Sequence, residues 1–423
     1  MGAGHGARAA QRARSAAQRL RSGRAGARAA AGAGERNGRP IITTITWHED
    51  GTERTALWRS ENGAPPPRRV VVADDTTKAD LAFRQASEGT ALLWRGDYQN
   101  ARQLLKALAR RADQPKRRAK RRSGSESEGA QAFHLYRQAR AQRARMLGML
   151  LVPVEPGHVV ALRRAPDVRA ACEEAYGPSD EPYVVSLREL LGLIGAHEWR
   201  VNGVPIGALG GARVHPHYGV FSPVRGEYVN LVERAPLPET GTAFDIGTGT
   251  GVLAAVLAHR GVGRVVATDM DQRALACARE NIERLGFQER VEVFQADLYP
   301  PARAGLVVCN PPWLPGKPAT PLEHAVYDQG GRMLRGFLDG LADHLEPGGE
   351  GWLIMSDLAE HLGLRGPGEL PDMIAAAGLR VLDRLDTRPV HGRARDTADL
   401  FHRARMAEIT SLWRLAPGDP QAE

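Results

Sequence analysis

The amino-acid sequence predicts an α/β protein, with a doubly wound, mostly parallel sheet in its C-terminal half and a smaller α/β domain before it. Strands and helices alternate regularly from Thr242 onward, which is typical of βαβ units. Within this region a short apolar strand runs directly into a glycine loop and a helix. The 423 residues also exceed one ordinary domain. We therefore expect a tail at 1–40, an N-terminal domain at 41–205 and the larger domain at 206–418.

The first 39 residues hold nine arginines and one acid, Glu35, among alanines and glycines. This composition cannot bury enough apolar surface to order itself, so we expect a disordered tail. A polyanion-binding arm, an organelle transit peptide and a misassigned start codon all fit, although most charge runs are only solvated tails. The excess of positive charge in the tail is as large as the formal net charge of +8 of the whole chain. A pI near 9.7 is therefore weak evidence that the protein binds nucleic acid.

The cysteines and the hydropathy pattern restrict the class of protein. Cys172, Cys277 and Cys309 are far apart and lack CxxC or Cys/His spacing, which argues against a disulfide framework and a zinc site. No stretch approaches 18 uninterrupted apolar residues, and the start lacks the apolar core of a secretory signal. We expect a soluble, cytoplasmic protein with no membrane partner and no metal, whereas its oligomeric state is not encoded in any pattern.

Several elements of the N-terminal domain can be predicted. The runs at 69–74 and 91–95 are short and apolar or β-branched, so they predict buried strands. Between 101 and 108 apolar residues recur with helical spacing. The charged, Ser/Gly-rich stretch at 116–129 predicts a loop that could contact phosphates. Ser186 and Glu189 have capping-box spacing and predict the start of a helix.

The larger domain opens with a ligand-binding turn. A strand at 243–246 runs into Gly247-Thr248-Gly249-Thr250-Gly251, and a helix follows at 252–259. Glycines allow a ligand to approach the backbone, and the helix start offers free N–H groups. The next strand, 264–268, ends at Asp269, where a carboxylate can accept ribose hydroxyls. Up to this point a dinucleotide and another nucleoside cofactor both fit. The G-x-G-x-G spacing, with Val252 where a third dinucleotide-type glycine belongs, argues against the dinucleotide.

A candidate catalytic motif, Asn310-Pro311-Pro312-Trp313, follows the strand at 306–309. Ligands bind at the carboxyl edge of such a sheet, where the strand order switches. The lone pair of a planar amine or amide nitrogen is delocalised, so a reaction at such a nitrogen needs acceptors that align its N–H groups. The Asn310 side-chain oxygen and the Pro311 carbonyl can supply two acceptors, the prolines stiffen the turn, and Trp313 offers a stacking face.

These motifs resemble those of class I S-adenosylmethionine-dependent methyltransferases. Asp245 before the glycine loop, Asp297 after the strand at 291–295 and the segment 345–349 (LEPGG) before a strand at 351–355 follow that family's order. The resemblance implies a Rossmann-like, seven-stranded sheet with a late antiparallel strand at 410–415, and S-adenosylmethionine as cofactor. It implies that Asn310 to Trp313 are catalytic. The cofactor-binding residues that it implies are Phe221, Asp245, Gly247, Thr248, Gly249, Gly251, Asp269, Met270, Asp297 and Asn310.

The resemblance is closest to the methyltransferase small-domain family, but it leaves the acceptor open. The segment 215–225 (HPHYGVFSPVR) is similar to ribosomal RNA guanine methyltransferases, in which the N-terminal position holds a degenerate copy of the catalytic fold. The segment 327–331 (YDQGG) is closer to the glutamine methyltransferases of release factors, whose Arg-Pro-Glu-Thr continuation is missing here. We expect methylation of a base in ribosomal or other structured RNA. A glutamine amide in a translation factor, and a non-catalytic ribosome-associated binding protein, are the alternatives.

Two further groups have structural interpretations. His215 and His217 could act as bases or metal ligands, but no carboxylate or cysteine stands at ligand spacing beside them, so we expect them to line the site at most. Cys277 shares a predicted helix face with Ala274 and Ala278, and Cys309 ends a strand, so both cysteines are expected to pack in the core.

Overall fold

A computed structural model describes residues 43–113, 129–389 and 399–418. From Ile45 onward the described residues form a compact unit that contains two large sheets. The tail predicted at 1–40 and the loop predicted at 116–129 lie, apart from Gly129, outside the described residues. None of the helices in the described ranges is long and apolar enough to cross a membrane.

The N-terminal sheet has six strands in the order β1-β2-β6-β5-β4-β3. Its strands β3, β4 and β5 run parallel, whereas β6 is antiparallel to β5. The strands are β1 (Thr44–Glu49), β2 (Thr52–Trp58), β3 (Arg69–Ala73), β4 (Thr90–Trp94), β5 (Leu150–Val154) and β6 (Tyr183–Ser186). The helices are α2 (Ala79–Ser87), α3 (Tyr98–Asp113), α4 (Ala130–Leu147), α5 (Arg169–Tyr176) and α6 (Leu187–Asn202).

The C-terminal sheet has seven strands in the order β11-β10-β9-β12-β15-β17-β16. From β11 to β15 neighbouring strands are parallel, and β17 is antiparallel to both of its neighbours. The strands are β9 (Thr242–Ile246), β10 (Arg264–Asp269), β11 (Val291–Gln295), β12 (Ala304–Cys309), β15 (Leu345–Ser356), β16 (Leu379–Thr387) and β17 (Thr410–Pro417). The strand order reverses between β9 and β12, which is where ligands bind in such sheets.

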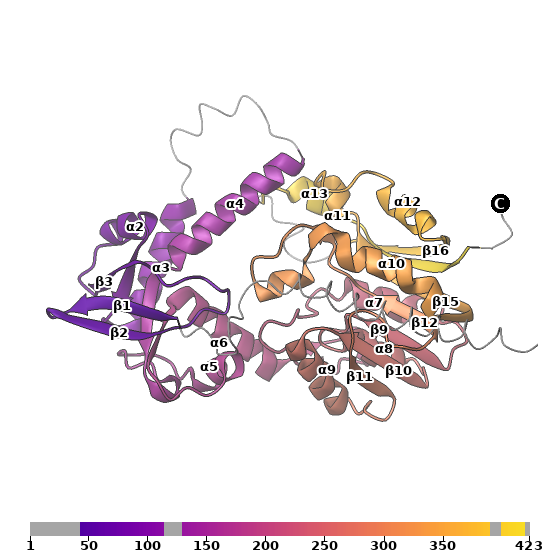
Figure 1. Cartoon of the computed structure of the whole chain (residues 1–423), viewed down its shortest axis with the longest axis horizontal. Coiled ribbons are helices and arrows are strands. Elements are labelled where there is room, and N and C mark those ends of the chain that lie inside the picture. Colours follow the sequence, from indigo (N-terminus) through magenta and orange to yellow (C-terminus); the bar gives the residue numbers. More distant parts are fainter. Residues whose placement is uncertain (1–42, 114–128, 390–398, 419–423) are drawn as a thin grey trace, which may run out of the picture. The chain divides into compact units, whose positions relative to one another are not determined.

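Helices cover both faces of this sheet (Figure 1). Because side chains alternate along a strand, Ala243 of β9 packs against α7 and α8, and its neighbour Phe244 packs against α10 and α12. Helix α8 is apolar all round, and all its residues except His259 are buried. The helices are α7 (Glu227–Arg234), α8 (Val252–His259), α9 (Gln272–Arg284), α10 (Arg332–His344), α11 (Leu358–His361), α12 (Glu369–Ala376) and α13 (His402–Ala407).

The structure corrects two local predictions. Strand β3 lies at a sheet edge and is partly exposed, because its apolar run has a partner on one side only. Strand β15 starts at Leu345 and therefore includes the LEPGG segment, since Leu345 pairs with Ala304 and a register shift absorbs the glycines. The strand orders of the two sheets differ, so the N-terminal sheet does not repeat the topology of the C-terminal one.

The capping box at Ser186 forms only in part. The Ser186 hydroxyl accepts the Glu189 N–H at 3.3 Å and caps α6, as predicted. The Glu189 carboxylate does not return to Ser186, because it accepts the Glu61 N–H at 2.8 Å and the Tyr176 hydroxyl at 2.7 Å. Glu189, which was predicted to complete the capping box, instead connects the loop at Glu61 and helix α5 to α6.

Candidate active site

The candidate site lies at the carboxyl edge of the C-terminal sheet. Ile246 of β9 is in register with Thr268 of β10 and with Cys309 of β12. The residues that follow these three positions, Gly247, Asp269 and Asn310, therefore lie at one level of the sheet edge and side by side. Motifs up to 63 residues apart in sequence are gathered at the point where the strand order reverses.

The glycine loop has a backbone that only glycine adopts readily. Gly247, Gly249 and Gly251 have φ values of +72°, +56° and +81°. A Cβ at Gly247 would overlap the methyl group of Met333, and one at Gly251 would lie 3.3 Å from the Ala278 Cβ of α9. The N–H groups of Gly247 and Thr248 both donate to the Thr268 carbonyl, at 2.9 and 2.8 Å. The loop is thus fixed to β10 and packed against α9.

The Asp245 carboxylate supports the loop from inside. Its Oδ2 accepts the Thr248 hydroxyl at 2.6 Å and the Ala254 N–H at 3.0 Å. The side chain is buried, and this burial raises the pKa of Asp245 to about 6 against the lowering effect of its hydrogen bonds. Asp245 therefore connects the loop to the start of α8.

Asp269 is half-buried at the end of β10 and faces the loop. One carboxylate oxygen accepts the Gly249 N–H at 3.0 Å, and the other accepts the Asp271 N–H at 3.0 Å. Burial raises the pKa of Asp269. Each carboxylate oxygen can accept a second hydrogen bond, so Asp269 keeps capacity for a ligand hydroxyl.

Met270 and Asp297 are joined by a residue that sequence reasoning missed. Arg332, at the start of α10, forms an ion pair with Asp297 at 2.6 Å. Its guanidinium also lies 3.8 Å from the Met270 sulfur. Because these three side chains are all exposed, the ion pair adds little stability, and its importance is that it brings the two predicted residues together.

The Asn310 side chain is held by its own motif. The indole N–H of Trp313 donates to Asn310 Oδ1 at 2.9 Å. An amide oxygen has two lone pairs, so one remains for a ligand N–H. Trp313 is half-buried and packs against the apolar clusters on both faces of the sheet. Its ring therefore anchors the motif, a role that the predicted stacking did not include.

A short ribbon follows the motif. Strands β13 (Leu314–Pro315) and β14 (Tyr327–Asp328) pair in parallel and close the intervening loop. The buried Asp328 accepts the N–H groups of Met333 and Leu334, at 3.2 and 3.0 Å, and so fixes the start of α10. The sequence drew attention to this segment as a family feature, whereas its structural role is to cap a helix.

The histidine segment packs on α9 rather than at the strand ends. His217 Nε2 lies 2.6 Å from a Glu280 oxygen, and its backbone N–H points to the Cys277 sulfur at 3.3 Å. No carboxylate stands at ligand spacing beside His217 in the sequence, and Glu280, which is 63 residues away, reaches it only in the fold. Burial lowers the pKa of His217, against the opposing effect of Glu280.

Asn281 is a second residue that the sequence reasoning missed. Its amide bonds both the N–H and the carbonyl of His215, at 2.7 and 3.1 Å, and also the Thr250 carbonyl at 3.0 Å. This buried residue therefore links the glycine loop to the segment that leads to Phe221, which is itself half-buried. The sequence offered one signal for this role, since Asn281 is a polar residue on the otherwise apolar face of the helix predicted around Cys277.

Comparison with known proteins adds independent evidence. Residues 211–362 match the methyltransferase small domain. The chain is 33% identical to a release factor glutamine methyltransferase of Cereibacter sphaeroides over 171 residues, which cover 35% of this chain and 62% of that protein. It is 30% identical to a ribosomal protein L11 methyltransferase of Sorangium cellulosum over 243 residues, 51% of this chain and 68% of that one. It is 28% identical to a tRNA1(Val) adenine-N6-methyltransferase of Shewanella sp. over 109 residues, 24% and 46% of the two chains.

Proposed function

Because this chain belongs to the methyltransferase small-domain family, we propose that it transfers a methyl group from S-adenosylmethionine to a planar nitrogen of a base in ribosomal or other structured RNA. The observation that carries the proposal is the alignment of the glycine loop, Asp269 and Asn310 at one level of the sheet edge. A cytoplasmic location agrees with this function.

The residues at the strand ends fit such a cofactor. The loop at Gly249 has open space beside its Cα, so a ligand can lie against the backbone there. Asp269 keeps acceptor capacity for the ribose hydroxyls, and Met270 and Asp297 would face the adenine. The bound cofactor supplies a methyl sulfonium, which is a good leaving group, so the protein needs no strong base.

Asn310 is proposed to align the acceptor nitrogen. Its Oδ1 holds the Trp313 N–H and keeps one lone pair for an N–H of the target. The Pro311 carbonyl would take the second N–H, and Pro312 stiffens the turn that holds both acceptors. Aligning the two N–H groups directs the nitrogen lone pair toward the methyl group, so positioning supplies most of the rate enhancement.

RNA is favoured as the acceptor by a concentration of positive charge near the site. Helix α4 has four arginines and no acid, and its Arg137 contacts the loop that follows the Asn310 motif. The tRNA adenine-N6-methyltransferase of Shewanella also acts, by its name, on an exocyclic amine. The sheet domain predicted at 41–205 would then select the RNA.

A glutamine amide is the second candidate. It presents the same planar N–H pair as a base amine, and the relative from Cereibacter sphaeroides is a glutamine methyltransferase. That relative is matched over 62% of its length, so its substrate does not transfer directly.

The test is transfer of a tritiated methyl group from S-adenosylmethionine to ribosomal RNA, ribosomal proteins and release factors. We expect label that ribonuclease removes and protease does not, and the reverse result would support the glutamine acceptor. Asn310→Ala should lower the rate roughly 10²- to 10³-fold, as loss of a positioned transition-state contact does. Its affinity for S-adenosylhomocysteine should change little. A wild-type protein that binds the cofactor but labels neither RNA nor protein would contradict catalysis and favour the non-catalytic binding protein.

A further inference from the structure

Helices α3 and α4 together carry eight lysines and arginines and a single acid, Asp113. That acid is already paired, because Arg143 of α4 binds both Asp113 oxygens, at 2.6 and 2.9 Å. This ion pair connects α4 to the end of α3. Because it occupies Asp113, the other lysines and arginines of the two helices have no free acid on either helix. Charge is thus concentrated here by the fold.

Three exposed arginines lie around this bridge. Arg110 is three residues before Asp113 on α3, and Arg140 is three residues before Arg143 on α4, so each shares a helix face with one partner of the bridge. Helix α3 packs against both α4 and α6, and Arg188 is in the first turn of α6. Desolvation and the positive charges of Arg143 and Arg140 lower the pKa of Arg188, so Arg188 lies within electrostatic reach of these two arginines of α4.

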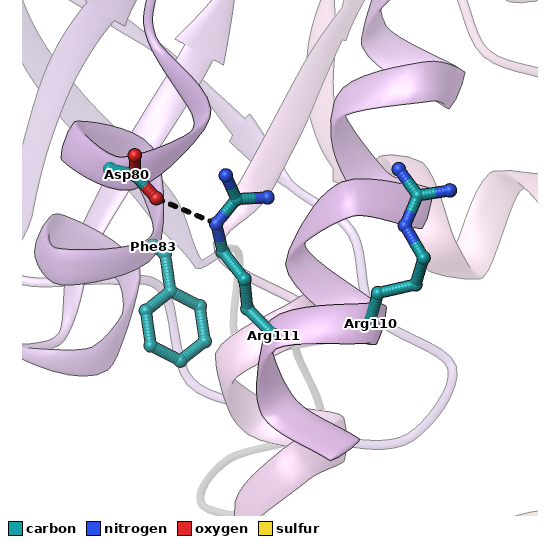
Figure 2. Close-up of a pocket in the computed structure, with 4 residues that line it drawn as sticks. All are labelled: Asp80, Phe83, Arg110 and Arg111. Carbon is teal, nitrogen blue, oxygen red and sulfur yellow. Dashed lines mark hydrogen bonds and ion pairs between the residues drawn. The ribbon is translucent and has the colours of Figure 1, made fainter. Parts of the chain in front are cut away.

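These three cations have no ion-pair partner in the part of the chain that the structure describes. Among the described residues, no carboxylate forms an ion pair with Arg110, Arg140 or Arg188. Glu189, the acid beside Arg188, is bound to the Glu61 N–H and the Tyr176 hydroxyl. Figure 2 shows the contrast within one helix: Arg111 is bonded to Asp80, while the Arg110 side chain lies apart from that pair. Clustered like charges raise the energy of the fold, and an anionic ligand relieves the repulsion.

Helix α4 connects this cluster to the candidate active site. Near its start, Phe133 packs against Leu314, the residue directly after Trp313. One turn later Arg137 donates to the Lys317 carbonyl at 2.8 Å and lies 3.9 Å above the Tyr327 ring. Arg140 and Arg143 follow within about 10–15 Å of Phe133 along the helix axis. A polymer bound at the cluster can therefore reach the Asn310 motif with a nearby unit.

We propose that Arg110, Arg140 and Arg188 bind the sugar-phosphate backbone of the RNA acceptor a few nucleotides from the base that is methylated. The inference rests on the proposed function. Guanidinium groups match phosphate oxygens in pairs, and such contacts position a nucleic acid without reading its sequence.

The test measures binding of the full-length protein to a labelled RNA hairpin between about 50 and 200 mM potassium chloride. The Arg140→Ala/Arg188→Ala double variant should weaken binding at least tenfold, and the slope of log affinity against log salt should become shallower by about 1.4–1.8. The Arg140→Lys/Arg188→Lys variant should keep most of the slope. Arg303→Ala is the matched control, because Arg303 is exposed and precedes β12 at the opposite sheet edge.

Each outcome separates the surface from the reaction. Unchanged S-adenosylhomocysteine affinity in the double variant excludes misfolding as the cause of lost RNA binding. If the wild type methylates RNA and the double variant binds RNA as Arg303→Ala does, the surface is wrong and the function stands. If the double variant loses affinity for polyglutamate but not for RNA, the surface binds acidic protein and the proposal is wrong. If RNA binding depends on these arginines but RNA is never methylated, the proposed function fails and the surface stands.

Discussion

The bond from Trp313 to Asn310 is the most informative contact at the residue scale. The tetrapeptide motif predicted both residues, but the sequence could not show that the aromatic ring fixes the asparagine through its N–H. A phenylalanine at this position keeps the ring and removes the donor. We expect Trp313→Phe to lower kcat roughly fivefold, which corresponds to the loss of about one hydrogen bond, with little change in the KM for the cofactor. Trp199→Phe, at an exposed position of α6, is the control, and an unchanged kcat in Trp313→Phe would contradict the anchoring role.

Asp245 should give the stability of the protein a characteristic pH dependence. Its pKa is raised from 3.8 to about 6 in the folded chain, so between these values the folded state holds a proton that the unfolded state lacks. The stabilisation is complete below pH 3.8 and is lost as the pH rises through about 6. The unfolding free energy of the wild type relative to Asp245→Asn should therefore fall by roughly 1–2 kcal/mol from about pH 5 to about pH 7.5 in urea titrations without cofactor. A constant difference, or a rise, would show that Asp245 is ionised throughout.

At the scale of elements, the glycine loop depends on how closely α8 and α9 pack. Gly251 has φ +81°, and a Cβ there would lie 3.2 Å from the Ala278 Cα. Gly286 has φ +75° with nothing within 4 Å of the added atom, so it reports the backbone strain alone. We expect Gly286→Ala to cost about 1–2 kcal/mol and Gly251→Ala to cost more, with weaker S-adenosylhomocysteine binding in Gly251→Ala only. Equal costs in urea unfolding would contradict the close packing.

The elements that sequence reasoning located well are short apolar runs between clear turn signals. The bounds of α8 and β11 are those expected from the pattern, because these runs have no competing interpretation. Helix α4 was not expected, since only Phe133 and Leu147 of its residues are buried and no apolar periodicity marks it. The contacts of Arg137 with Lys317 and Tyr327 were equally hidden, because they join segments about 180 residues apart.

At the scale of the whole molecule, the distribution of charge is more informative than its total. Residues 1–40 hold nine arginines and one acid, and the remaining chain has equal numbers of basic and acidic residues. A net charge of +8 therefore says nothing about the folded unit, whose cations are concentrated on particular helices. Cations from different helices come close together only when the chain folds, so the composition could not reveal where they gather.

Deletion of residues 1–40 tests this division. We expect the shortened chain to keep its affinity for S-adenosylhomocysteine and its dependence on Arg140 and Arg188 for RNA binding. Its RNA affinity at low salt should fall, and the slope of log affinity against log salt should become shallower. The shortened chain lacks the arginines of the tail and therefore displaces fewer counterions when it binds RNA. Filter binding at several salt concentrations would measure this change. Loss of cofactor binding on deletion would mean that the tail takes part in the catalytic unit.

Calorimetric titration with S-adenosylhomocysteine tests most directly whether Asp269 and the loop from Gly247 to Gly251 form a site for S-adenosylmethionine. We predict saturable binding with one site per chain and at least a tenfold loss of affinity in Asp269→Ala, because the ribose hydroxyls lose their acceptor. Nicotinamide dinucleotides should not compete. Absence of binding, or a preference for a dinucleotide, would contradict the account from the glycine loop onward.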